Sequence, residues 1–256
     1  MEQRLPESIR KWAGAREFTA DTTGMSGAMV LCFEDMVLKI EKACEESDRE
    51  RAAMAWMWGR LPVPRILCAE TADGVNYLLM SRVAGEMACG ETWLRRPEAM
   101  IRLLAEGLNQ LWATDTAACP LENGLENKLR AARARVESGE CDTENVQPDT
   151  YGERGFESPA ALLEWLTANR PEETPVLTHG DYCLPNVFLK DGGVGGLIDL
   201  GRAGLADRWQ DIALCYRSLK SNLGWESALP MRLFAELGIA PDWEKIRYYI
   251  LLDELF

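Results

Sequence analysis

Three side chains that can do chemistry lie in one short apolar stretch, LTHGDYCLPNVFL, at residues 177–189. They are His179, which is the only histidine of the chain, Asp181 and Asn186. A second stretch, VGGLIDLGRAG, follows closely and contains Asp199. Because a strand-like segment does not carry this much polarity at its centre without cause, the two stretches together are a candidate site.

The segments VFLKD and VGGLIDL, joined at residues 191–193, are predicted to form a β-hairpin. The start of one antiparallel strand neighbours the end of its partner, so Asn186 and Asp199 should lie at the same rim. Two side-chain oxygens there suit a hard cation such as Mg²⁺, and Asp181 can orient a hydroxyl group beside it. The spacing H-x-D-x-x-x-x-N, followed by D-x-G, is that of the catalytic and metal-binding loops of kinases.

Each of these residues also has a simpler interpretation. Asp and Asn favour turns, so any one of them alone could be a turn residue. His179 is interpreted as a hydrogen-bonded scaffold residue rather than a general base. No Ser or Cys partner motif accompanies it, which argues against hydrolase chemistry.

Lys39 stands between apolar residues in MVLKI, on a segment that resembles a central strand. A buried lysine needs an anionic partner. Glu50 lies four residues before Met54, on the apolar stripe of the next predicted helix. We therefore expect Lys39 and Glu50 to form an ion pair. Lys39 is also expected to hold the nucleotide phosphates. A structural salt bridge or a snorkelling lysine is the alternative, and Glu45 and Glu46 are competing partners.

The remaining nucleotide contacts are expected in a loop and in a hinge. The loop TGMSGAMV has small residues, including Ser26, that let backbone N–H groups approach a triphosphate, although an ordinary hairpin turn fits equally well. In NYLLMSRVAGE, the backbone groups of Ser81 and Val83 could contact the adenine edge, and Met80 could line the pocket or simply belong to the core.

The helices and strands that must position these residues are predicted to form an α+β fold with two lobes. Residues 1–83 are predicted to form a β-rich N-terminal lobe with one helix, which begins at Ser47 or Asp48 as N-cap and runs to about Leu61. Residues 84–256 are predicted to form a mostly helical C-terminal lobe, with a ligand cleft near residues 80–85. In that lobe we predict helices that start at Pro97, at residue 125, after Ser158 as N-cap, and at about 206, 225 and 242, with a long loop over 138–157.

Composition narrows the class of protein. The chain has 256 residues and a formal net charge of −13, so nucleic acid is not an expected partner. The acidity has two interpretations, simple solubility or attraction of a polycationic ligand. The eight cysteines include no CxxC pair and suit a reducing cytosol, and no apolar run approaches the roughly 20 residues that span a bilayer. We therefore expect a cytoplasmic protein, with neither a secretory signal nor a membrane partner, that is a monomer or weak dimer.

Nearly the whole chain resembles the aminoglycoside 3′-phosphotransferases of the kanamycin-kinase type, which have a protein-kinase-like fold. The resemblance is carried by GMSGAMV, VLKI, LPVPRIL, LLMSRVAG, THGDYCLPNVFLKDGGVGGLIDLGRAGLADRWQDIALCYRS and PDWEKIRYYILLDELF. It implies transfer of the γ-phosphate of ATP, with Mg²⁺, to the 3′-hydroxyl of an aminoglycoside antibiotic.

The same resemblance assigns roles to individual residues. Asp181 matches the catalytic aspartate, and Val37 stands where some relatives carry an aromatic residue that stacks on adenine. The nucleotide and metal positions that match are Met25, Ser26, Lys39, Glu50, Asn186 and Asp199. The substrate positions that it implies are Arg202, Asp253, Glu254 and the α-carboxylate of Phe256, with Asp149 and Glu153 on an acidic loop that could act as a lid.

Two other functions remain open at the level of sequence. One is a kinase of another small metabolite, such as choline or a thio-sugar, which would not require the acidic C-terminus. The other is a nucleotide-binding pseudokinase that acts as a partner-binding module, against which the complete set Lys39, Asp181, Asn186 and Asp199 argues. A protein kinase is less favoured, because IDLGRAGLADRW leaves little room for an activation segment.

Overall fold

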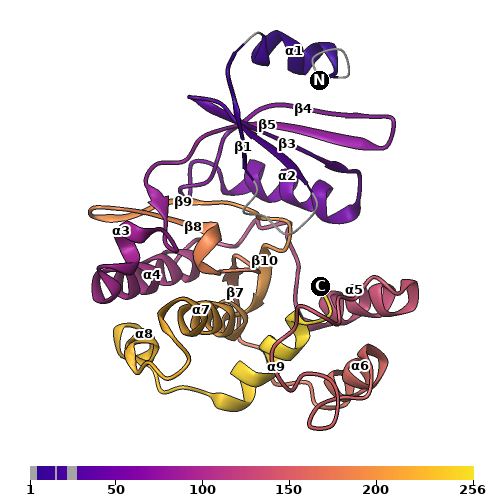
Figure 1. The fold of residues 1–256 in the computed structure, drawn as a ribbon, viewed down its shortest axis with the longest axis vertical. Coiled ribbons are helices and arrows are strands. Elements are labelled where there is room, and N and C mark those ends of the chain that lie inside the picture. Colours follow the sequence, from indigo (N-terminus) through magenta and orange to yellow (C-terminus); the bar gives the residue numbers. More distant parts are fainter. Residues whose placement is uncertain (1–4, 15, 22–27) are drawn as a thin grey trace.

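The protein folds into two lobes, seen one above the other in Figure 1. The structure, a computed structural model, describes residues 5–14, 16–21 and 28–256. The first lobe is built on an antiparallel five-stranded sheet with the order β1-β2-β3-β5-β4. Its strands are β1 (Thr19–Asp21), β2 (Met29–Cys32), β3 (Met36–Lys42), β4 (Ile66–Ala72) and β5 (Val75–Ser81).

A helix covers each face of this sheet (Figure 1). Helix α1 (Glu7–Ala13) contributes Ile9 to a cluster with Leu38, whereas α2 (Glu45–Met57) buries Met54 in the main core. Successive side chains of a strand point to opposite faces. Lys39 therefore lies on the α2 side of β3, as its predicted contact with that helix requires.

Helix α2 begins earlier than predicted. Its N-cap is Cys44, and Ser47 occupies the third helical position, so the prediction of Ser47 or Asp48 as N-cap was wrong. The Ser47 hydroxyl accepts a hydrogen bond from the Cys44 N–H at 3.1 Å and donates to the Cys44 carbonyl at 2.8 Å. Ser47 thus stabilises the helix start from inside the first turn, the place that a capping box gives to its third residue. The helix ends at Met57 rather than near Leu61.

The second lobe is mostly helical. Its helices are α3 (Glu91–Leu94), α4 (Pro97–Trp112), α5 (Leu125–Ser138), α6 (Pro159–Ala168), α7 (Arg208–Leu223), α8 (Arg232–Leu237) and α9 (Trp243–Asp253), with short 3₁₀ turns η2 (Leu184–Asn186) and η3 (Leu229–Met231). Its strands are β6 (Glu86–Met87), β7 (Pro175–Thr178), β8 (Val187–Lys190), β9 (Gly193–Leu197) and β10 (Gly204–Asp207), arranged as the sheets β6-β8-β9 and β7-β10.

Several sequence predictions for this lobe are confirmed. Pro97 opens α4, and the Ser158 hydroxyl caps α6 by accepting a hydrogen bond from the Ala161 N–H at 3.2 Å. The long loop at residues 139–157, all described in the structure, contains neither a helix nor a named strand. The helix predicted at about residue 225 is α8, which starts later, at Arg232. Gly224 ends α7, and an irregular turn precedes η3 at Leu229.

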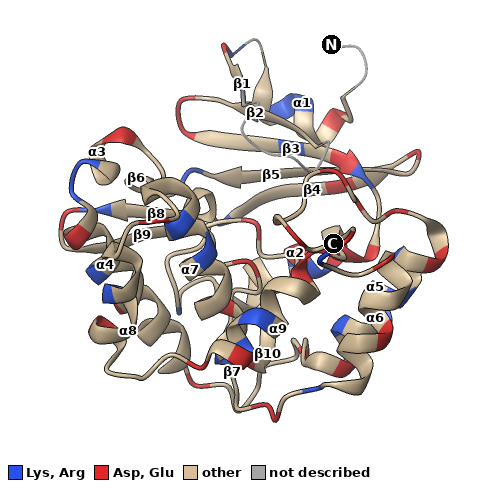
Figure 2. Ribbon diagram, turned by 60° about the horizontal axis from the view of Figure 1, so that its bottom comes forward, with Lys and Arg blue, Asp and Glu red and all other residues tan. Residues whose placement is uncertain are grey.

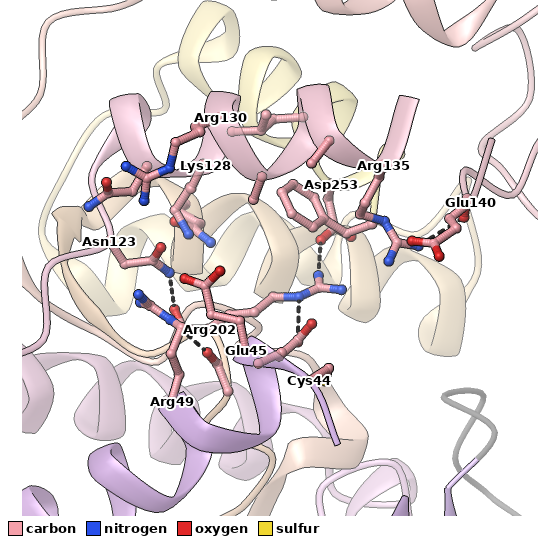
Figure 3. A pocket seen from close by; sticks show the side chains of 18 of the residues that line it. Cys44, Glu45, Arg49, Asn123, Lys128, Arg130, Arg135, Glu140, Arg202 and Asp253 are labelled. Carbon is pink, nitrogen blue, oxygen red and sulfur yellow. Dashed lines mark hydrogen bonds and ion pairs between the residues drawn. The ribbon is translucent and has the colours of Figure 1, made fainter. Parts of the chain in front are cut away.

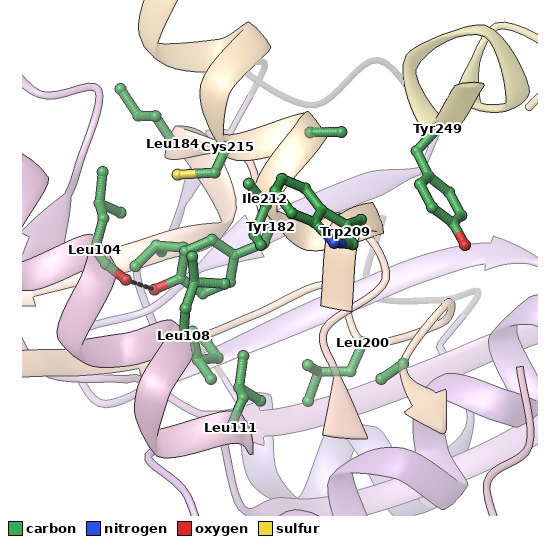
Figure 4. Packing of buried hydrophobic residues seen from close by; sticks show 14 of the residues in the cluster. Leu104, Leu108, Leu111, Tyr182, Leu184, Leu200, Trp209, Ile212, Cys215 and Tyr249 are labelled. Carbon is green, nitrogen blue, oxygen red and sulfur yellow. Dashed lines mark hydrogen bonds between the residues drawn. The ribbon is translucent and has the colours of Figure 1, made fainter. Parts of the chain in front are cut away.

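A close-packed core fixes the chain beneath the predicted catalytic stretch (Figure 4). Tyr182 is fully buried, and its hydroxyl donates to the carbonyl of Leu104 in α4 at 3.0 Å. Gly107, one turn further along α4, leaves room for that ring, since a Cβ there would overlap the Tyr182 hydroxyl. The residue after Asp181 is therefore anchored to α4 by both packing and a hydrogen bond.

Charged residues are distributed over both lobes, as Figure 2 shows. Within the described ranges, no helix combines the length and apolar character needed to cross a bilayer. Residues 82–85 connect β5 to β6. The boundary between the lobes at residues 83 and 84 stays a prediction.

Candidate active site

The stretch that carries His179 and Asp181 is held from below by the start of α7. The Asp211 carboxylate accepts the N–H of His179 at 2.7 Å and the N–H of Gly180 at 2.8 Å, and all three groups are buried. Gly180 has φ +90°, and a Cβ there would overlap the carbonyl of Arg202. The loop therefore requires glycine at this position.

His179 belongs to the support of the loop. It is fully buried, and its Nδ1 accepts the N–H of Asp181 at 3.3 Å. Burial lowers the pKa of His179, so its imidazole is neutral, and the edge of the ring packs against Tyr182. These contacts support the scaffold interpretation of His179 rather than a role as general base.

Asp181 and Asn186 are brought together at the mouth of the hairpin. The Asn186 amide group donates to the Asp181 carboxylate at 2.9 Å and to the Asp181 carbonyl at 3.1 Å. Burial, with a smaller contribution from Asp253, raises the pKa of Asp181 to about 6, although the guanidinium of Arg202 opposes that rise. Because the Asn186 nitrogen faces Asp181, its amide oxygen is left to face a ligand.

Asp199 lies beside Asn186, as the hairpin predicts. Strand β9 ends at Leu197, two residues before Asp199 and thus slightly earlier than predicted. The N–H of Ile198 donates to the Asn186 carbonyl at 3.0 Å, which ties the two hairpin ends together. Asp199 itself has φ +59°, a sparsely populated conformation for a residue with a side chain. An exposed carboxylate held in such a backbone conformation is typical of a functional site.

The predicted meeting of Lys39 and Glu50 is present in the structure. The Lys39 ammonium lies 2.8 Å from the Glu50 carboxylate, which is 3% exposed. It also lies 3.4 Å from Asp199 and 3.4 Å from Glu41. Burial alone would lower the pKa of Lys39, but the attraction of Glu50 and the other two carboxylates outweighs it and raises that pKa, so the ammonium stays charged. One cation of the N-terminal lobe thus reaches a carboxylate of the C-terminal lobe.

These residues supply only part of the ligand set of a magnesium ion. Asn186 and Asp199 offer two oxygens, and across residues 5–14, 16–21 and 28–256 no group of three or more His, Cys, Asp or Glu side chains is placed to bind a metal. Mg²⁺ commonly takes one or two protein oxygens and completes its octahedron with water and phosphate oxygens. The donor set therefore fits a magnesium ion that arrives with a nucleotide.

The nucleotide-binding positions are only partly visible. Met25 and Ser26 lie outside the described residues. Met80 is 9% exposed and pairs with Val37 across the sheet, so most of its side chain belongs to the core. The Ser81 N–H donates to the Arg65 carbonyl at 2.9 Å, which leaves the Ser81 carbonyl for the predicted contact with adenine. The N–H of Val83 has no backbone partner in the described chain, and both adenine contacts stay predictions.

Two arginines pair with the acidic residues of the C-terminus. Arg202 donates to Asp253 at 3.0 Å and to Glu46 at 3.1 Å, and its guanidinium lies 4.8 Å from the centre of the Phe256 ring. Arg217 bonds the other oxygen of Asp253 and lies 3.5 Å from Glu254. Four of the predicted substrate residues therefore form one connected group, although Glu254 is 8% exposed and faces mainly inward.

Asp149 and Glu153 lie apart from this group. Both are exposed, and in the described chain neither side chain forms a hydrogen bond or an ion pair. Asp149 has φ +65°, and the turn after it is closed by the Phe156 N–H donating to the Thr150 carbonyl at 2.8 Å. The loop is joined to the C-terminus at one point, where the Gln147 N–H donates to Glu254 at 3.2 Å.

Three residues of the site had no role in the sequence analysis. Asp211 holds the catalytic loop, Gln210 donates to the Gly180 carbonyl at 2.6 Å, and Arg217 pairs with Asp253. All three lie on α7, in the run DRWQDIALCYRS. The signal in the sequence was a Gln and an Asp directly before the apolar run IALC, since polar side chains that become buried need hydrogen-bond partners.

Comparisons with known proteins agree with this geometry. Residues 18–249 match the model of the phosphotransferase enzyme family. The chain is 39% identical to an aminoglycoside 3′-phosphotransferase of Enterococcus faecalis, over 99% of this chain and 98% of that one. The crystal structure of an aminoglycoside-3′-phosphotransferase of type VIII superposes with a TM-score of 0.82 at 29% identity, covering 97% of this chain and 98% of the other. An aminoglycoside phosphotransferase of Streptomyces rimosus in complex with ADP and streptomycin gives a TM-score of 0.80 at 25% identity, covering 97% and 96%.

Proposed function

Because this chain belongs to the phosphotransferase enzyme family, and within it to the aminoglycoside phosphotransferases, we propose that it transfers the γ-phosphate of ATP to the 3′-hydroxyl of an aminoglycoside antibiotic. The observation that carries the proposal is the approach of Lys39 to Asp199 at 3.4 Å, beside the Asp181–Asn186 hydrogen bond of 2.9 Å. In this proposal Lys39 binds phosphate, Asn186 and Asp199 supply two oxygens for the metal, and Asp181 orients the acceptor hydroxyl. Such transfer depends on positioning and charge neutralisation more than on covalent chemistry by the protein.

Asp181 is the catalytic residue of this proposal. Its carboxylate accepts a hydrogen bond from the acceptor hydroxyl and aligns it with the γ-phosphate. The Asn186 amide holds one carboxylate oxygen at 2.9 Å, which fixes the direction of the other. Because its pKa is about 6, the carboxylate is mostly ionised at pH 7 and can take up the hydroxyl proton as transfer is completed.

The nucleotide side of the site uses both lobes. Lys39, fixed by Glu50, would contact the α- and β-phosphates, and Asn186 and Asp199 would hold Mg²⁺. When bound, the ion neutralises charge on the phosphate oxygens. Met25 and Ser26 would cover the phosphates, while Val83 and the wall formed by Met80 and Ser81 would border the adenine.

The acceptor side binds amino groups. We propose that the ammonium groups of the substrate contact Asp253, Glu254 and the α-carboxylate of Phe256, because ammonium–carboxylate hydrogen bonds are among the strongest polar contacts. In this proposal Arg202 borders the acceptor by fixing Asp253, to which it donates at 3.0 Å. Asp149 and Glu153 would add charge from the loop at residues 139–157. The enzyme is proposed to work in the cytoplasm as a monomer or weak dimer, without nucleic acid or membrane partners.

The test is a coupled ADP-release assay with kanamycin, its 3′-deoxy analogue and streptomycin as acceptors. We expect turnover with kanamycin and none above background with the deoxy compound. Comparable turnover of the deoxy compound would refute the 3′ position. Turnover with streptomycin alone would instead match the relative that was crystallised with ADP and streptomycin. Turnover of choline or a thio-sugar, or nucleotide binding without turnover, would favour one of the two alternatives from the sequence.

A further inference from the structure

A pocket of about 510 Å³ lies between the start of α2, helix α5 and the C-terminal segment (Figure 3). Its wall includes Arg202, Asp253 and Phe256, which the proposed function assigns to the acceptor side. We therefore refer to it as the acceptor pocket. The first turn of α2 belongs to the N-terminal lobe, whereas α5 and the C-terminal segment belong to the other lobe. The acceptor pocket is thus shared by the two lobes.

The first turn of α2 presents two carboxylates to this pocket, and only one of them has a cationic partner. Glu46 pairs with Arg202 at 3.1 Å. Glu45 is exposed and lines the pocket, and in the part of the chain that the structure describes its side chain forms neither a hydrogen bond nor an ion pair. Lys39, the cation for which Glu45 competes in the sequence, pairs with Glu50 instead. Glu45 therefore has no role in the nucleotide site.

Contacts between the lobes fix the first turn of α2 beside the pocket. Arg49 donates to the carbonyls of Gly201 at 3.3 Å and Ala203 at 3.5 Å, both just before β10. Gly201 also packs against Glu46, since a Cβ at Gly201 would lie 2.6 Å from the Glu46 Cγ. The backbone that carries Glu45 is therefore held in place relative to the other lobe by hydrogen bonds and packing.

The opposite wall of the pocket carries hydrogen-bond donors. Figure 3 shows Lys128 and Arg130 on α5, across the pocket from Glu45 on α2. Lys128 is 4% exposed, and among the described residues its side chain has no hydrogen-bond or ion-pair partner. Burial lowers the pKa of Lys128 to about 7, so its charged and neutral forms are both populated near pH 7. A polar group that is buried in a pocket without a protein partner indicates that a ligand satisfies it.

The two walls suit the two kinds of polar group that an aminoglycoside carries. Ammonium groups form charge-assisted hydrogen bonds with carboxylates, which the pocket offers at Glu45 and at the C-terminal segment. Hydroxyl and ether oxygens accept hydrogen bonds from donors such as Lys128 and Arg130. A sugar in this pocket would therefore turn its amino groups towards α2 and the C-terminus, and its oxygens towards α5.

We propose that Glu45 is a specificity-determining residue of the acceptor pocket, where its carboxylate accepts hydrogen bonds from one ammonium group of the aminoglycoside. The inference rests on the proposed function and adds a contact from the N-terminal lobe to the C-terminal carboxylates. Glu45 is suited to this role because it is the α2 carboxylate of the pocket that Arg202 leaves unpaired. Helix α2 also carries Glu50, the partner of Lys39, so acceptor and nucleotide would contact groups on or fixed by the same helix.

The experiment is steady-state ADP release with kanamycin, in which the parent chain is compared with Glu45→Gln and Asp48→Asn. Asp48 is the matched control, because it lies in the same first turn, pairs with Arg51 and does not line the pocket. We expect Glu45→Gln to raise KM for kanamycin about tenfold, since a charge-assisted hydrogen bond is lost, while kcat and KM for ATP stay within about twofold of the parent. Asp48→Asn should leave all three parameters unchanged.

The mono-N-acetyl derivatives of kanamycin, each of which lacks one ammonium group, identify the contact. For the derivative acetylated at the contacted amine, KM should rise in the parent but not further in Glu45→Gln, whereas the other derivatives should keep the full effect of the substitution.

The outcomes separate this inference from the proposed function. Turnover of kanamycin by the parent with an unchanged KM in Glu45→Gln would overturn the role of Glu45 and leave the proposed function standing. An equal rise of KM in Asp48→Asn, or a tenfold rise of KM for ATP in Glu45→Gln, would overturn it as well, since the effect would then not come from an acceptor contact. Absence of turnover by the parent with every aminoglycoside tested would overturn the proposed function, and the inference with it.

Discussion

The substitution Asp211→Asn separates positioning of the catalytic loop from direct chemistry. The Asp211 carboxylate accepts two buried N–H groups, from His179 at 2.7 Å and from Gly180 at 2.8 Å. An asparagine of the same shape can accept only one of them, and its NH₂ group then faces the other donor. Since a hydrogen bond to a charged group contributes about 1.5–3 kcal/mol, we expect the free energy of unfolding to fall by about 2–3 kcal/mol.

The catalytic consequence follows from the same two contacts. Asp181 is the next residue in the loop, and a displacement of about 1 Å in a reacting group can cost about a hundredfold in rate. We therefore expect kcat to fall at least about tenfold, while KM for ATP stays close to that of the parent because Lys39, Glu50 and Asp199 are untouched.

The assays are urea unfolding followed by fluorescence and steady-state ADP release with kanamycin. Asp242→Asn is the matched control: Asp242 caps α9 by accepting the Lys245 N–H at 3.0 Å, and asparagine caps a helix as well as aspartate does. Wild-type kcat in Asp211→Asn, with unfolding as in Asp242→Asn, would refute the claim that Asp211 positions the loop. An equal fall in both variants would show that the effect is not specific to the loop.

Three further predictions concern the charged groups and the glycine of the site. Lys39→Met should raise KM for ATP and lower kcat/KM about a hundredfold or more while leaving the far-ultraviolet circular dichroism unchanged, and unaltered kinetics would remove Lys39 from the nucleotide site. Asp181→Asn should abolish turnover yet raise the free energy of unfolding at pH 7. Folding raises the pKa of Asp181 from 3.8 to about 6, so the folded protein binds the proton more tightly than the unfolded chain does. Ionisation of Asp181 at pH 7 therefore lowers the stability of the parent by at most about 3 kcal/mol, and this cost fades as the pH falls from 6 to 4. Parallel stability curves of the parent and this variant over that range would contradict the assignment. In the parent, kcat/KM, which reports the free enzyme, should fall as the pH drops through about 6. Gly180→Ala should prevent the loop from forming, because φ is +90° and the new Cβ would overlap the Arg202 carbonyl, so a folded variant with normal turnover would contradict the geometry.

The fold and several contacts of the site could be predicted because their signals are local in the sequence. The comparisons confirm the predicted two-lobed α+β fold and the resemblance to the aminoglycoside phosphotransferases. Hairpin geometry brought Asn186 and Asp199 together, and the contact of Lys39 with Glu50 followed from two charges on apolar surfaces. In each case the partners lie on neighbouring elements, so pattern and period were sufficient.

The missed features depend on contacts between distant elements. The partners of Asp211 lie more than thirty residues away, on a loop whose path no local pattern reveals. Cys44 and Ser47 both have side chains that can serve a helix start, and periodicity alone did not place the first turn. The hydrogen bond from the Ser81 N–H to the Arg65 carbonyl joins the end of β5 to the residue before β4. The sequence of the hinge alone does not reveal this contact.

The two arginines at the C-terminus can hold its carboxylates in place without substrate and still leave the cluster able to attract a polycation. Asp253 and Glu254 would repel each other if left unpaired, and Arg217 bridges them. Arg202 pairs with both Asp253 and Glu46, so the two arginines face three carboxylates and the cluster keeps a net negative charge. Ionised Asp181, whose pKa is raised in part by Asp253, adds to that charge. In the proposed acceptor site, an arriving ammonium group would therefore relieve repulsion that the arginines only partly cancel, next to the carboxylate proposed to align the hydroxyl.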